Sequence, residues 1–99
     1  MKSRTKLLEE IQVILNERGS LYGSSRTNHE RISELWSAYL GDYISPMQAS
    51  MCMLLVKVSR ISESPSHFDS VKDILGYAAI YNELINSYEN DFGGEVNGI

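Results

Sequence analysis

Residues 45–61 decide how this 99-residue chain folds, and they read SPMQASMCMLLVKVSRI. Ser45 is a preferred helix N-cap, Pro46 suits the first helical position, and Gln48 completes a capping box. From Met47 onward the segment is apolar over most of a helix circumference. That pattern is typical of a helix at the centre of a bundle or at a subunit interface. The segment is too short for a membrane span, which takes about 20 consecutive apolar residues.

Three further helices are expected around this segment, each an apolar repeat at helical spacing beside a capping residue or a glycine. They span residues 5–18, 27–40 and 67–88. Gly19 is expected to end the first helix, and Ser66 to cap the last one. The sequence therefore predicts an all-α fold, a compact bundle of about four helices that forms a homo-oligomer through its apolar third helix.

The connection before the second helix is expected to be a long loop over residues 19–27, rich in glycine and serine. Thr27 and Glu30 are expected to form a capping box. The predicted buried stripe of this helix consists of Ile32, Leu35, Trp36, Tyr39 and Leu40. A Gly/Ser loop that leads into a helix N-terminus can hold an anion with its backbone N–H groups. Tyr22 and Asn28, beside this loop, are therefore candidate ligand-binding residues.

Length and composition indicate one domain, residues 1–90, and a flexible glycine-containing tail, residues 91–99. Thirteen acidic and nine basic residues give a net charge of −4. This balance argues against a nucleic-acid polymer as partner, but two or three placed cations can still hold a phosphate-bearing small molecule.

No membrane span or cleaved signal is expected, so the predicted compartment is the host cell cytoplasm, with no membrane partner. Cys52, the one cysteine, lies in an apolar run and is expected in the core. One cysteine and two histidines do not make a zinc site of usual spacing, and no cofactor is expected. His29 and His67 lie at predicted helix starts and are expected to be surface or capping residues.

Charged residues gather where the third and fourth helices are joined. Lys57 and Arg60 lie near the end of the third helix, and Asp69 and Asp73 lie one turn apart at the start of the fourth. A short loop between antiparallel helices brings these four groups together. Two outcomes are open: Arg60 forms a structural bridge to Asp73 or Asp69, or the cations and carboxylates line a polar pocket.

Gly76 and Tyr77 follow on the same helix. Glycine inside a helix costs roughly 1 kcal/mol relative to alanine, so Gly76 indicates a close approach to the backbone. A packed neighbour is the first explanation and a ligand the second. Tyr77 continues the line of Asp69 and Asp73 and offers a ring for stacking or a hydroxyl for hydrogen bonding.

Several separated pieces of the sequence agree, in order, with one known family. They are YG at 22–23, NHERI at 28–32, LWSAYL at 35–40, KVSRI at 57–61, HFDS at 67–70 and DILGYAA at 73–79. Together they cover roughly residues 20–85 and resemble a family of small phage and prophage proteins with an uncharacterised domain. Gln48 departs from the pattern, because an acidic residue is expected there. The resemblance implies a phage origin and action in the cytoplasm of an infected bacterium, and it supplies no reaction.

The first functional hypothesis is a non-enzymatic nucleotide-binding protein. As an oligomer it would sequester a phosphate-bearing immune signal, a cyclic nucleotide or an ADP-ribose-type molecule, and so act as an anti-defence sponge. Its candidate ligand-binding residues are Lys57 and Arg60 for phosphate, Asp69 and Asp73 for sugar or base, Tyr77 or Tyr22 for stacking, and Asn28.

Two other functions stay open. One is a metal-dependent, all-helical nucleotide pyrophosphatase-like enzyme that uses Asp69 and Asp73. Such enzymes hold Mg²⁺ with clustered carboxylates, but here Glu9 and Glu10 are adjacent rather than three apart, and the third helix supplies cations. The other is a protein-interaction module whose partner surface is the methionine-rich third helix.

Overall fold

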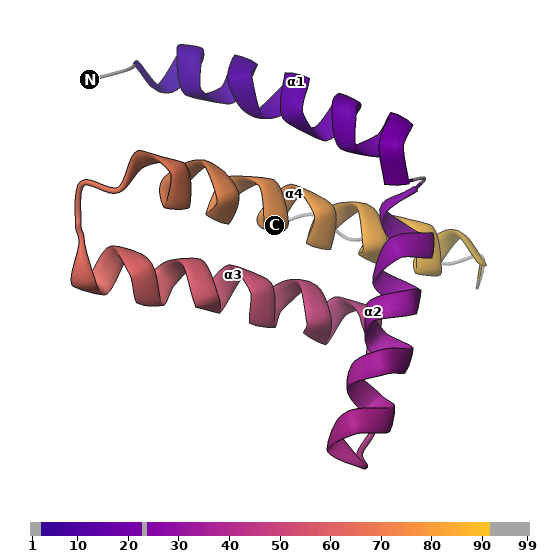
Figure 1. Cartoon of the computed structure of the whole chain (residues 1–99). Coiled ribbons are helices and arrows are strands. Elements are labelled where there is room, and N and C mark those ends of the chain that lie inside the picture. Colours follow the sequence, from indigo (N-terminus) through magenta and orange to yellow (C-terminus); the bar gives the residue numbers. More distant parts are fainter. Residues whose placement is uncertain (1–2, 23, 92–99) are drawn as a thin grey trace.

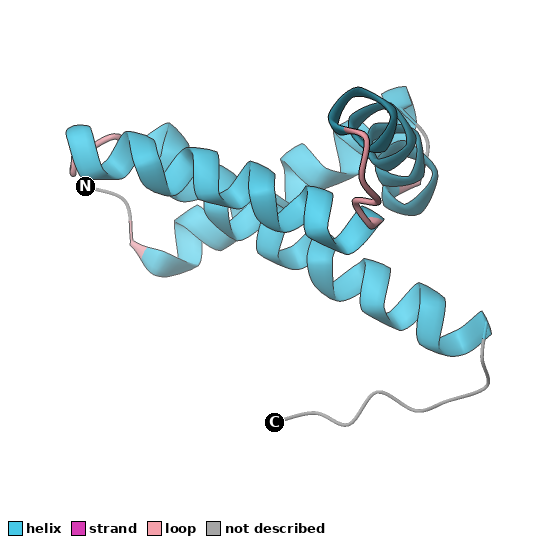
Figure 2. Cartoon of the chain, turned by 90° about the horizontal axis from the view of Figure 1, so that it is seen from below, coloured by secondary structure: helices cyan, strands magenta, loops and turns pink. Residues whose placement is uncertain are grey.

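The computed structural model describes residues 3–22 and 24–91, except for the side chains of residues 21 and 22. Within these ranges the chain forms four helices and no strand (Figures 1 and 2). The helices are α1 (Arg4–Tyr22), α2 (Ser25–Leu40), α3 (Pro46–Glu63) and α4 (Phe68–Asp91). The predicted all-α architecture is confirmed. Asp91 ends α4, and the rest of the predicted tail lies outside the described residues.

The predicted start of α3 is confirmed in detail. The Ser45 hydroxyl accepts the backbone N–H of Gln48 at 3.0 Å, and the Gln48 side chain accepts the N–H of Ser45 at 2.9 Å. At the start of α4, His67 takes the capping position instead of the predicted Ser66. Its Nδ1 accepts the backbone N–H of Ser70 at 3.2 Å, so the capping role expected for this histidine is also confirmed.

Helices α3 and α4 form an antiparallel hairpin that carries most of the contacts between elements. Ala49 and Ser50 are fully buried on the α3 side, and Leu84 is fully buried on the α4 side. The Ser50 hydroxyl donates to the backbone carbonyl of Tyr77 at 3.1 Å, which fixes the register of the two helices. Helix α1 packs against α4 through Ile11, so α4 lies between α1 and α3 (Figure 1).

The link between α1 and α2 differs from the prediction. Helix α1 continues through Gly19 to Tyr22, and α2 already begins at Ser25. Ser24 is the N-cap in place of Thr27, because its hydroxyl accepts the Thr27 N–H at 3.2 Å. A glycine weakens a helix without necessarily ending it, and an earlier serine caps equally well. The predicted loop over residues 19–27 is therefore much shorter.

The predicted buried stripe of α2 is largely wrong for the single chain. Leu35, Tyr39 and Leu40 are 64%, 90% and 61% exposed, whereas His29 and Ser33 are buried. Figure 1 shows the reason: α2 crosses the end of the α3–α4 hairpin, and its C-terminal half projects beyond it. Among the described helices, α3 and α4 are within reach of the N-terminal half of α2 alone.

Cys52 is not buried in the core, although the sequence predicts that it is. It is exposed. An apolar run indicates which residues avoid water, but none of the described helices covers Cys52. Among the described helices, none is both long enough and apolar enough to cross a membrane.

Candidate functional site

A cleft of about 490 Å³ opens where α1, the first turns of α2 and the middle of α4 meet. This volume is within the range of roughly 300–1,000 Å³ that is typical of small-molecule sites. Its apolar walls are Ile14, Leu15, Ile32, Met53 and Ile80. Arg18, Asn28, His29 and Tyr77 supply polar groups, and the carboxylate of Glu17 also borders it. Apolar walls with a few polar groups are the usual composition of a ligand site.

The cleft continues into a narrow groove between α1 and α4. The groove shares Ile14, Leu15, Arg18, Tyr77 and Ile80 with the cleft. It adds Lys72, Asp73 and Gly76 of α4. The groove therefore connects the cleft with the start of α4, where the sequence analysis placed its candidate residues.

His29 is the most unusual residue of the cleft, because it is only 2% exposed. Its Nδ1 lies 3.0 Å from the backbone carbonyl of Ser25. A carbonyl can only accept, so Nδ1 carries the proton and donates. In the neutral ring, Nε2 is then a buried acceptor, and no group of the described residues donates to it. Leaving such an atom unpaired costs about 1–3 kcal/mol, and a ligand donor would remove that cost.

This position corrects the prediction that His29 is a surface or capping residue. The prediction assumed that α2 begins at Thr27, which would have placed His29 in the exposed first turn. Because α2 begins at Ser25, His29 lies one turn inside the helix, on the side that meets α4.

The N-terminus of α2 lies beside this ring and favours an anion. The Ser24 hydroxyl accepts the N–H of Thr27, and the Ser24 carbonyl accepts that of Asn28 at 3.1 Å. The N–H groups of Ser25 and Arg26 have no partner within the helix, as in any first turn. Together with the positive end of the helix dipole, they can bind a phosphate oxygen.

Arg18 brings a positive charge to the same place from α1. It borders both the cleft and the groove. The sequence analysis missed it, although a signal was present: Arg18 continues, one turn on, the apolar row of Ile11, Ile14 and Leu15. A cation at the end of a buried row faces the core side of its helix.

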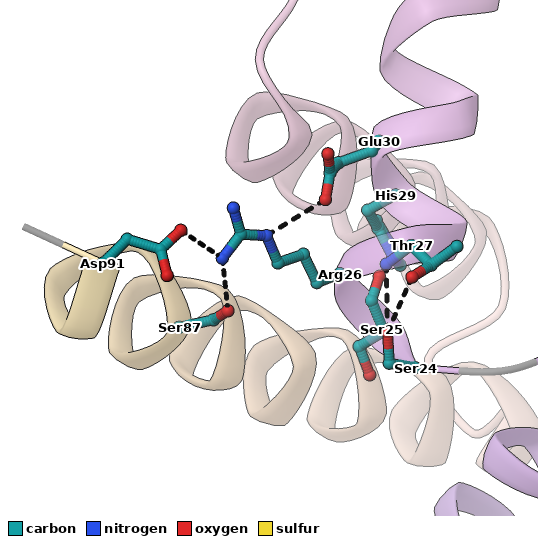
Figure 3. A network of polar contacts seen from close by, with 8 residues as sticks. All are labelled: Ser24, Ser25, Arg26, Thr27, His29, Glu30, Ser87 and Asp91. Atoms are coloured by element: carbon teal, nitrogen blue, oxygen red, sulfur yellow. Dashed lines mark hydrogen bonds and ion pairs between the residues drawn. The ribbon is translucent and has the colours of Figure 1, made fainter.

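Arg26 is not part of the cleft, because its side chain is engaged on α4 (Figure 3). Its Nε lies 3.0 Å from Glu30 Oε1, and its Nη1 lies 2.6 Å from Asp91 Oδ2 and 3.0 Å from the Ser87 hydroxyl. The guanidinium also lies 4.2 Å from the centre of the Tyr88 ring. The hydrogen bond to Asp91 is the main cause that raises the pKa of Arg26. Burial raises the pKa of Tyr88. This network fastens the start of α2 to the end of α4.

The predicted bridge between α3 and α4 is present, but its cation is Lys57 and not Arg60. Lys57 Nζ lies 3.0 Å from Asp73 Oδ2, and the two side chains are 15% and 32% exposed. The register set by Ser50 and Tyr77 places position 57 level with position 70, and the long side chain of Lys57 spans the remaining turn of α4 to reach Asp73. Arg60 is exposed.

The other predicted site residues do not form a single pocket: Asp69 lies on the surface of α4, whereas Asn28 and Tyr77 lie in the cleft. Asp69 is 80% exposed and lies 3.4 Å from Lys72 Nζ on its own helix, so it does not share a pocket with Lys57. Asn28 and Tyr77, although distant in sequence, both line the cleft. The side chain of Tyr22 lies outside the described residues, as does Gly23. No three His, Cys, Asp or Glu side chains within residues 3–22 and 24–91 are grouped to hold a metal ion.

Gly76 is not explained by a packed neighbour, which was the first explanation. A Cβ added there would meet no heavy atom within 4 Å outside its own turn of helix. It borders the groove between α1 and α4 instead.

Replacing Gly76 with alanine is expected to raise the free energy of unfolding by about 0.5–1 kcal/mol, because alanine is the better helix former and meets open space. Urea denaturation measures this change. The matched control is Gly41→Ala at the C-cap of α2. Gly41 has φ +71°, so alanine there is strained and is expected to destabilise the chain. A loss of stability in Gly76→Ala would mean that the groove is filled in the folded chain.

Comparison with known proteins places these features in a family. Residues 6–85 match the family described as Domain of unknown function (DUF6378), and this range contains every residue that lines the cleft. The Gene 55 protein of Mycobacterium phage L5 is 38% identical over 74 residues, which cover 74% of this chain and 47% of that protein. The Gene 55 protein of Mycobacterium phage D29 is 36% identical over 90 residues, which cover 90% of this chain and 58% of that protein. The chain thus spans about half the length of these curated relatives. No solved structure matches it.

Proposed function

Since the chain belongs to the DUF6378 family of domains of unknown function, which has phage relatives, we propose that it is a non-enzymatic protein that captures a phosphate-bearing nucleotide. The proposed site is the cleft at the N-terminus of α2. The observation that carries the proposal is the buried, unpaired Nε2 of His29 beside the anion-binding start of a helix. A ligand that suits both features must bring a negative charge and a hydrogen-bond donor.

A nucleotide meets this requirement. Its phosphate suits the first N–H groups of α2 and the guanidinium of Arg18. A ribose hydroxyl or an exocyclic amino group can donate to His29 Nε2. Tyr77 offers a ring to the base, and Asn28 offers an amide that both donates and accepts. In this arrangement Arg18 takes the phosphate role that the sequence analysis gave to Lys57 and Arg60.

Phage relatives favour a role in the host cytoplasm, where the protein would sequester a cyclic nucleotide or an ADP-ribose-type signal of host defence. Lys57 and Asp73 stay candidates for the far end of a larger ligand. Their ion pair is half-buried, and Asp73 lines the groove that runs on from the cleft. A metal-dependent pyrophosphatase draws no support from the described side chains, because a magnesium site needs several clustered oxygen ligands.

A binding panel tests the proposal. The purified chain is titrated calorimetrically with cyclic di-AMP, cyclic di-GMP, cyclic ADP-ribose and ATP, each with and without Mg²⁺, and the bound nucleotide is recovered for mass analysis. We expect at least one nucleotide to bind and to be recovered unchanged. Arg18→Gln is expected to weaken that binding by about ten- to hundredfold, since charge-assisted hydrogen bonds contribute about 1.5–3 kcal/mol.

The matched control is Arg31→Gln, which removes the same charge from an exposed position of α2 that does not line the cleft. Its affinity should equal that of the unchanged chain. If no nucleotide binds at millimolar concentration, the proposal is wrong. Magnesium-dependent conversion of a nucleotide would replace it with the enzyme hypothesis.

A further inference from the structure

The outer face of α3, which we define as Met51, Cys52, Leu55, Val56 and Val58, has no partner within the described chain. Four of these side chains are substantially exposed: Met51 by 38%, Leu55 by 55%, Val56 by 47% and Val58 by 39%. Cys52 is exposed as well. The segment from Pro46 to Val56 contains no charged residue. Apolar faces of this kind mark interaction sites.

The described chain buries little apolar surface of its own. Its buried hydrophobic residues are Ile11, Ala49, Ile80 and Leu84, and one of these is only an alanine. In contrast, eleven large hydrophobic residues are exposed. A small domain with so little core is marginal, and burial against another subunit is a common remedy. The apolar surface that the single chain leaves exposed therefore affects the stability of the fold itself.

The small amount of buried apolar surface indicates which molecule covers the outer face of α3. A partner that completes the core must be present whenever the chain is present, and at a matching concentration. A second copy of the chain meets both conditions, whereas a transient partner meets neither. The absence of charge has the same implication, because two copies of an acidic chain repel each other unless the surfaces that meet are neutral.

Helix α2 adds exposed apolar side chains to the outer face of α3. A stable dimer buries about 800 Å² on each subunit. Helix α2 projects past the hairpin on the side of α3 that faces away from α4 (Figure 1), and it carries the exposed Leu35 and Tyr39. The outer face of α3 and the projecting half of α2 together present exposed apolar side chains that a second copy can bury.

We infer that two copies of this chain form a two-fold dimer through the outer faces of their α3 helices. In a two-fold contact the same patch serves both subunits, and the neutral outer face meets its own copy without opposed charges. The contact leaves the cleft open, because α1 and α3 lie on opposite sides of α4. The inference is independent of the nucleotide proposal, so either can fail without the other.

Sedimentation velocity of the full chain, from low to high micromolar concentration, tests the inference. We expect a species of twice the chain mass of 11.2 kDa. Leu55→Glu, in the middle of the face, is expected to raise the dissociation constant at least a hundredfold and to give monomers. The matched control is Leu8→Glu, at an equally exposed leucine of α1, which should stay dimeric.

Cys52 supplies a second measurement in case Leu55→Glu does not fold. Because the contact buries Cys52, its thiol should react with a maleimide reagent more slowly as the protein concentration rises through the dissociation constant. A monomer at every concentration, or a rate of Cys52 modification that does not change with protein concentration, would overturn the inference.

Discussion

Replacing His29 with leucine is expected to weaken nucleotide capture by about ten- to hundredfold and to leave the fold intact. The affinity falls because a buried hydrogen bond from the ligand to Nε2 is lost, which is worth about 1–3 kcal/mol. Stability changes little, since two effects oppose each other. Leucine removes the unpaired Nε2, and it also removes the hydrogen bond from Nδ1 to the Ser25 carbonyl. Calorimetric titration and a thermal melt measure the two quantities.

The control for this variant is His67→Asn. His67 is the other histidine, and it caps α4 through Nδ1 far from the cleft. Asparagine is itself a good N-cap, so the helix start should be retained. We expect this variant to bind nucleotide as the unchanged chain does. Equal affinity in His29→Leu would mean that the ring does not contact the ligand.

Replacing Leu84 with alanine is expected to have the largest effect on stability, a loss of about 2–5 kcal/mol. Leu84 is fully buried on α4, and it is one of the few large apolar side chains in the core. A domain of this size is stable by roughly 5–15 kcal/mol, so the loss removes much of the total. Urea denaturation at one fixed protein concentration measures it, because a dimer's stability depends on concentration.

Leu8→Ala is the matched control, since Leu8 is 56% exposed on α1. Its free energy of unfolding should change by less than about 0.5 kcal/mol, as for most surface substitutions. A loss below about 1 kcal/mol for Leu84→Ala would show that the cluster around it is not the core of the fold.

Helices were predictable where local chemistry determines them. The capping box of Ser45 and Gln48 lies entirely within one turn, and it forms as predicted. The end of α1 was not predictable in the same way. Gly19 weakens the helix, but whether it ends there depends on the following residues and on packing against α4. The sequence also identified the apolar residues of α2, but it could not predict their exposure, because exposure depends on packing against the other helices.

The candidate site was predictable only in part. Asn28 and Tyr77 were selected and do meet in one cleft. Arg18 and His29 were missed, because their importance depends on the angle between α1 and α2 and on the true start of α2. The ion pair between α3 and α4 was expected, but a sequence without a register could not distinguish Lys57 from Arg60.

The cleft and the outer face of α3 allow one joint expectation. They lie on different sides of the hairpin, so dimerisation should not block capture, and each subunit should hold its own nucleotide. A two-fold dimer with one ligand for each chain suits a protein that sequesters a signal. Such a protein holds the bound nucleotide and does not convert it into a product.

The most direct measurement is a long-range ¹H–¹⁵N correlation spectrum of the two histidine rings, recorded without and with saturating nucleotide. Without ligand, His29 should be protonated at Nδ1 with a free Nε2, and His67 should show the opposite tautomer because its Nδ1 accepts from Ser70. With ligand, the Nε2 signal of His29 should move to lower frequency, as for a nitrogen that accepts a hydrogen bond, while His67 stays unchanged. An unmoved His29 signal in a chain shown to hold the nucleotide would contradict the account.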